Sequence, residues 1–96
     1  MQQEMIGKIT NIKLGTLLAG SPTETDFCAI TVKETSSGKL FVFHLWSVRI
    51  ADLPEHRVEQ SQRLAVAREA AFRKLTVHLF HDSTASLVDQ IQIDTP

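Results

Sequence analysis

The sequence predicts a mainly β fold in which five strands and one helix follow the order β-β-β-α-β-β. Two apolar segments, 27–34 and 39–46, flank a short turn, as in a β-hairpin. From Glu55 to Leu75 the chain contains neither Gly nor Pro, which favours a helix, and two more apolar segments follow. Because 96 residues suit one domain, residues 1–96 are expected to form a single domain.

The first strand is expected at residues 6–14. Its isoleucines, Ile6, Ile9 and Ile12, recur at every third position, whereas side chains on one face of a regular strand recur at every second. One extra residue in a β-bulge resets this alternation, so we expect a bulge or a strong bend here. Residues 15–26 contain two glycines and a Ser-Pro pair, which predicts a long loop.

The predicted hairpin turn is 35–38, with Gly38 at its end. The strand that follows, 39–46, is apolar on both faces, and 47–50 can continue it. One face carries Phe41, Phe43 and Leu45. The other face carries Leu40, Val42, His44 and Trp46. This pattern indicates either a strand covered on both sides or a strand that presents aromatic rings to a ligand.

The helix is expected to begin at Asp52, which can cap it together with Glu55, while Pro54 suits the first turn. At helical spacing, its apolar stripe contains Leu64, Ala67, Ala71 and Leu75, widened by Ala65 and Phe72. Its basic residues alternate with glutamates and are expected to face solvent; they are Arg57, Arg63, Arg68 and Arg73.

Two strands, 76–81 and 87–94, are expected after the helix, joined by the short polar loop 82–86. In the second of these strands, Ile91 and Ile93 alternate with polar residues, which is typical of one buried and one solvated face.

Four segments carry a resemblance to a known family: GKI at 7–9, FCAITV at 27–32, FHLW at 43–46 and SLVDQIQID at 86–94. Together they resemble bacterial single-stranded-DNA-binding proteins and their primosomal relatives, which share a Trp at the end of the third strand. The order of elements is also that of the OB-fold, a five-stranded Greek-key barrel. The resemblance implies an OB-like barrel, although the helix is longer and the loop 82–86 shorter than in that family.

Single-stranded nucleic acid is therefore the first candidate ligand, bound without catalysis. Aromatic rings for base stacking and basic groups for the backbone are the expected contacts. The candidate residues are Trp46, Phe41, Phe43, Lys33, Lys39 and Arg49. Phe41 and Phe43 equally suit the core, whereas Trp46, beside Ser47, is the candidate expected to be exposed.

The alternative is a protein-interaction or assembly domain, either a homodimer or a subunit of a complex, with no nucleic-acid binding. The net charge of −1 favours this alternative, and the chain lacks the basic stripe of a strong duplex binder. Salt-dependent retention on single-stranded oligonucleotides separates the two functions, because absence of binding at low salt would exclude nucleic-acid binding.

No enzyme, cofactor or metal site is expected. His78 and His81 are three positions apart on a strand and point to opposite faces, and no nucleophile has a recognisable base. Cys28 lies in an apolar run and is expected to be a buried, unreactive thiol. With no apolar run long enough for a membrane span and no basic segment at the start, a cytoplasmic location is expected.

Overall fold

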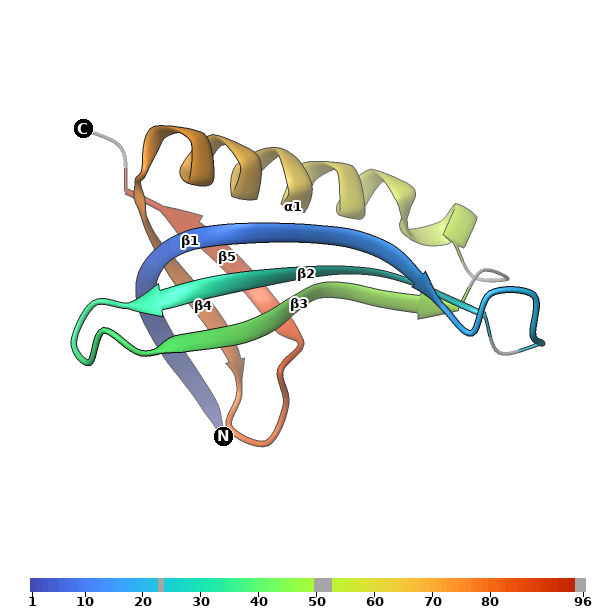
Figure 1. The fold of residues 1–96 in the computed structure, drawn as a ribbon, viewed down its shortest axis with the longest axis horizontal. Helices are drawn as coiled ribbons and strands as arrows, with labels where there is room; N and C mark the ends of the chain where they lie inside the picture. The colour runs from blue at the N-terminus through green and yellow to red at the C-terminus, as the bar shows by residue number, and fades with distance from the viewer. Residues whose placement is uncertain (23, 50–52, 95–96) are drawn as a thin grey trace.

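The sheet is organised around one long strand, β1 (Gln2–Leu17), in a computed structural model that describes residues 1–22, 24–49 and 53–94. The other elements are β2 (Thr25–Glu34), β3 (Leu40–Arg49), α1 (Leu53–Arg73), β4 (Thr76–Asp82) and β5 (Val88–Ile93). The predicted order of elements and the mainly β class with one helix are confirmed (Figure 1). The predicted cap at Asp52 lies outside the described residues.

Strand β1 bends, and its two parts pair with different strands (Figure 1). Residues 2–8 pair with β4 and residues 7–17 pair with β2, both antiparallel. The register shifts between Ile9 and Asn11, which is the predicted irregularity. A bulge increases the local twist of a strand, and this allows β1 to leave one partner and join the other.

Glycine is required at position 7, where β1 passes from one partner strand to the other. A Cβ atom there would overlap the backbone oxygen of Lys33 on β2. At Gly15 a Cβ would lie 3.0 Å from the Phe27 ring, which packs directly over this glycine. Gly15 therefore belongs to a strand and makes room for a ring, although the sequence suggested a loop.

The predicted loop 15–26 is wrong at both ends. Strand β1 extends to Leu17 and β2 begins at Thr25, so the connection is much shorter. Leu18 in this connection adopts a left-handed conformation with φ of 54°. Gly20 and the Ser-Pro pair lie in this connection as predicted, whereas the residues at both ends of the predicted loop are held in strands by backbone pairing.

The five strands form one antiparallel sheet in the order β3-β2-β1-β4-β5. This leaves β3 and β5 as the two edges. Within the described residues the edges meet at one isolated parallel bridge between His44 and Leu87, where the His44 amide donates to the Ser86 carbonyl at 2.8 Å. The sheet is therefore strongly curved, but no hydrogen-bonded ladder between described residues closes it.

Helix α1 packs on the inner side of the curved sheet and completes the core. Ala67 and Ala70 are fully buried, and such small side chains let the helix backbone approach the strands closely. The predicted extension of the apolar stripe to Phe72 is wrong, because this ring is 90% exposed. Among the described helical residues, no segment is long and apolar enough to cross a membrane.

The helix ends in a Schellman motif centred on Lys74. The Leu75 amide donates to the Ala70 carbonyl at 2.9 Å, and the Lys74 amide donates to the Ala71 carbonyl at 3.4 Å. This motif requires a left-handed residue after the helix, and Lys74 supplies it with φ of 56°. Lysine lacks the conformational freedom that makes glycine common at this position.

Replacing Lys74 with glycine is expected to raise the free energy of unfolding by about 1 kcal/mol, because it removes the penalty of a left-handed L-residue. Urea denaturation measures this change. The Lys74→Ala variant is the control, since it removes the lysine side chain and retains the backbone penalty. Equal stabilities of the glycine and alanine variants would contradict the prediction.

Candidate functional site

The part of the sheet formed by β1, β2 and β3 has a buried inner face and an exposed outer face. Residues paired across the strands share a face, so the register defines rows across the sheet. On the inner face, Cys28, Ile30 and Val32 of β2 are fully buried. The five outer rows are Lys8–Lys33–Leu40, Asn11–Thr31–Val42, Lys13–Ala29–His44, Gly15–Phe27–Ser47 and Leu17–Thr25–Arg49.

Two of the aromatic residues predicted to stack on bases lie in the core. Phe43 is 5% exposed and Trp46 is 9% exposed, and the Trp46 indole Nε1 donates to Asp26 Oδ2 at 2.9 Å. The prediction that Trp46 is exposed is therefore wrong. The register of β3 shifts between Trp46 and His44, so Leu45 is an extra residue and Trp46 turns to the inner face.

The other predicted site residues are dispersed. Phe41 also belongs to an inner row, opposite Val32, and is 38% exposed near the end of the sheet. Lys33 lies on the outer face and is exposed, whereas exposed Lys39 precedes β3 in the hairpin connection. The backbone of Arg49 pairs with Thr25 at the end of β3, and its side chain is outside the described part of the structure.

The outer face carries lysines that the sequence analysis did not select. Lys8 of β1 shares an outer row with Lys33 of β2, and Lys13 of β1 lies in another outer row. All three residues are exposed. None of the residues in the five outer rows is acidic. Lys8 and Lys33 are directly opposite each other, which places two like charges side by side on the sheet. The strand register brings these lysines onto one face, and the register cannot be read from the sequence.

An aromatic ring forms the centre of the outer face. Phe27 lies over Gly15 and meets the His44 ring edge-on, with 6.3 Å between the ring centroids. Phe27 is 9% exposed, as Trp46 is, so its ring is covered and supports the outer face without offering an accessible surface. The half-buried His44 lies beside it towards β5, where its Nδ1 is 3.3 Å from the Ser86 hydroxyl oxygen.

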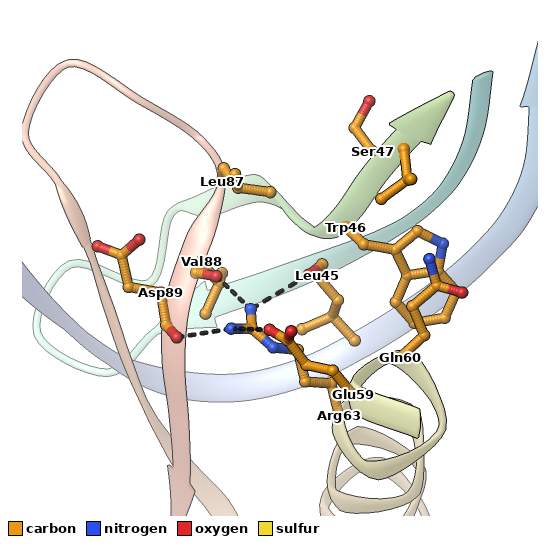
Figure 2. A pocket seen from close by; sticks show the side chains of 10 residues that line it. Leu45, Trp46, Ser47, Glu59, Gln60, Arg63, Leu87, Val88 and Asp89 are labelled. Atoms are coloured by element: carbon orange, nitrogen blue, oxygen red, sulfur yellow. Dashed lines mark hydrogen bonds and ion pairs between the residues drawn. The ribbon is translucent and has the colours of Figure 1, made fainter. Parts of the chain in front are cut away.

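Arg63 of α1 joins the two edge strands of the sheet (Figure 2). Its Nη1 donates to the carbonyls of Leu45 at 3.2 Å and of Val88, and its Nη2 donates to the Asp89 carbonyl at 2.7 Å. The same Nη2 lies 2.8 Å from a carboxylate oxygen of Glu59. The expectation that Arg63 simply faces solvent is wrong, because its guanidinium replaces missing strand-to-strand hydrogen bonds.

Beside Arg63, β3, α1 and β5 enclose a pocket of about 480 Å³ (Figure 2). Leu45, Trp46 and Leu87 contribute apolar surface to its lining. Gln60 also lines the pocket and is only 8% exposed, and its Nε2 has no hydrogen-bond partner among the described residues. A buried amide donor without an acceptor costs free energy, so it marks the part of the pocket where an acceptor would be favourable.

His78 joins three segments on another part of the sheet. Its Nδ1 lies 3.0 Å from Glu4 Oε2 of β1, and its Nε2 lies 2.9 Å from Asp94 Oδ2, immediately after β5. The hydrogen bonds to Asp94 and Glu4 raise the pKa of His78 above its usual value of 6.5. Protonated histidine can donate from both nitrogens, so the charged form fits this arrangement.

Stability is therefore expected to fall as the pH rises through the His78 pKa. The folded protein holds this proton more tightly, so the contribution is complete below pH 6.5 and is lost above the raised pKa. Urea midpoints between pH 6 and pH 9 test this expectation. The His78→Gln variant should lose the part of the slope that depends on Glu4 and Asp94. An unchanged slope in this variant would show that other groups cause the dependence.

Reactive groups are scarce in the described residues. Burial, and secondarily the charge of Asp26, raise the pKa of the Cys28 thiol to about 11, and this residue is fully buried, as predicted. No group of three or more His, Cys, Asp or Glu side chains there is arranged to hold a metal ion.

The arrangement thus offers two surfaces that can bind: an outer face with three lysines and a partly apolar pocket at the edge of β3, whose charged lining residues are Arg63, Glu59 and Asp89. Ser47 belongs to both, because it pairs with Phe27 in an outer row and lines the pocket. Comparison with models of protein families, with curated proteins and with solved structures found no match to this chain.

Proposed function

We propose that this protein is a non-enzymatic binding module for single-stranded nucleic acid, and that the outer face of β1, β2 and β3 contacts the backbone of the strand. The observation that carries the proposal is the cluster of Lys8, Lys13 and Lys33 in rows without an acidic residue. Lysines directly opposite each other destabilise a sheet, and a bound anion would relieve that repulsion. A polyanion that passes from the row of Lys8 and Lys33 to the row of Lys13 would meet all three amines.

An OB-type barrel is the fold that we propose for this module. The element order, the bent β1 and the bridge between His44 and Leu87 support it, since OB-folds bring their third and fifth strands together. Arg63 supports the same assignment, because it connects β3 to β5 beyond the bridge. In OB-folds, oligonucleotides bind to the face that contains the second and third strands.

Single strands suit this surface better than a duplex. The net charge is only −1, and three amines on one face provide a weak, local attraction. The half-buried His44 ring on the outer face can contact an unpaired base, and a duplex hides its bases in its interior.

Fluorescence anisotropy with a labelled dT oligomer tests the proposed function. Binding is expected at low salt, and the slope of log K against log[salt] should be about −2, from roughly −0.7 per neutralised phosphate and three lysines. A duplex of the same length should compete poorly. Absence of binding at low salt, where phosphate contacts are strongest, would refute the proposal.

A protein-interaction role is the second candidate, and exposed leucines favour it. Leu17 at the end of β1 and Leu18 in the connection that follows are neighbours, and each is at least half exposed. Exposed apolar clusters commonly mark interaction sites. Light scattering tests the homodimer form: a dimer that the Leu17→Ser/Leu18→Ser variant converts to a monomer would support this role, and a monomeric wild type would exclude the homodimer.

A further inference from the structure

We infer that the pocket beside Arg63 receives one nucleobase of the strand that lies on the outer face. This inference rests on the proposed function and adds to it the part of the ligand that the pocket recognises. The pocket of about 480 Å³ falls within the size range of small-molecule sites.

The charges around the pocket exclude a phosphate as its occupant. The guanidinium of Arg63 is already engaged by three backbone carbonyls and by Glu59. The lining also includes the acidic residues Glu59 and Asp89, which would repel an anion. A neutral ligand is therefore favoured.

The lining specifies the chemistry of that neutral ligand. Leu45, Trp46 and Leu87 provide apolar surface, and Figure 2 shows the Gln60 side chain reaching from α1 towards Trp46. Gln60 Nε2 lacks an acceptor among the described residues and would gain one from a ligand that carries an acceptor. Nucleobases combine an apolar, planar body with ring-nitrogen and carbonyl acceptors on their edges, and each base has such an acceptor.

The position of the pocket connects it to the outer face. The row through Gly15 and Phe27 ends at Ser47, which lines the pocket. The row through Lys13 ends at His44, which is bridged to Leu87 on the opposite rim. A strand that crosses the sheet along these rows therefore reaches the pocket where it leaves β3, and a base can enter while its phosphates remain beside Lys13.

The test uses uncharged nucleosides, so that the lysine face contributes little. Adenosine, guanosine, cytidine and uridine are added separately to ¹⁵N-labelled protein while the Gln60 side-chain amide and the Leu87 backbone amide are observed. At least one nucleoside is expected to shift both signals in a saturable manner. Absence of a saturable shift at Gln60 for all four would overturn the inference.

The Gln60→Leu variant removes the unpartnered donor and nearly preserves the volume of the side chain. Its stability should not fall, because no buried polar group loses a partner. We expect about tenfold weaker binding of the nucleoside and of an oligomer made of the same base, but unchanged binding of an abasic oligomer of the same length. Gln62→Leu, at an exposed position of the same helix, is the matched control and should change nothing.

The outcomes separate this inference from the proposed function. If an oligomer made of the base that shifts Gln60 binds wild type and Gln60→Leu equally, the inference is wrong and the proposed function stands. If no oligomer binds at low salt, the proposed function is wrong and the inference falls with it.

Discussion

Replacing Arg63 with methionine is expected to lower the free energy of unfolding by about 3 kcal/mol, the largest stability effect of the substitutions considered. The guanidinium donates to carbonyls of β3 and β5, and the side chain is only 21% exposed. Charge-assisted hydrogen bonds contribute about 1.5–3 kcal/mol each, and water can reach part of this site and replace some of them. Methionine keeps the length of the side chain but donates to none of the three carbonyls.

Urea denaturation measures this loss, and Arg68→Met is the matched control. Arg68 is exposed on the same helix, so its replacement is expected to change stability by less than about 0.5 kcal/mol. Hydrogen exchange at the His44 amide provides a second readout, because it bonds to the Ser86 carbonyl at the bridge beside Arg63. If the two variants are equally stable, Arg63 does not hold the edge strands together.

Reversing two charges on the outer face, in the Lys13→Glu/Lys33→Glu variant, is expected to weaken binding of a dT oligomer by about 100-fold at low salt. Each substitution removes one phosphate contact and adds a repulsion in rows that contain no acid. The effect should shrink as salt is added, since screening weakens both contributions. Anisotropy titrations at several salt concentrations measure it.

The control for this variant changes the total charge of the protein by the same amount, but on helix α1. Arg57 and Arg68 are exposed on α1, and the Arg57→Glu/Arg68→Glu variant makes the same total change in charge away from the outer face. It is expected to reduce affinity only slightly. Equal losses in the two variants would mean that overall charge, and not the outer face, governs binding.

The sequence predicted those parts of the fold that depend on local pattern. The hairpin of β2 and β3, the extent of α1 and the alternation in β5 follow from turn residues, helical spacing and period two. The irregularity in β1 was predicted because the isoleucine spacing breaks the period two of a strand within the segment itself.

The candidate site was harder to predict because it depends on contacts between distant segments. One extra residue, Leu45, turns Trp46 inward, and nothing in the β3 sequence distinguishes this bulge from regular alternation. The lysine cluster combines positions of two strands whose register is set by pairing. Arg63 lies at a solvent-like position in the helix pattern, yet it bonds to carbonyls of segments far away in the chain.

Mapping the bound strand on the surface is the most direct test of the central claim, that the outer face of β1, β2 and β3 binds single-stranded nucleic acid. Titration of ¹⁵N-labelled protein with a dT oligomer at low salt is expected to shift the amides of Lys8, Lys13, Thr31 and Lys33. The exposed helix positions Arg68 and Phe72 should remain unchanged. Shifts confined to α1, or no shifts at any position, would contradict the claim.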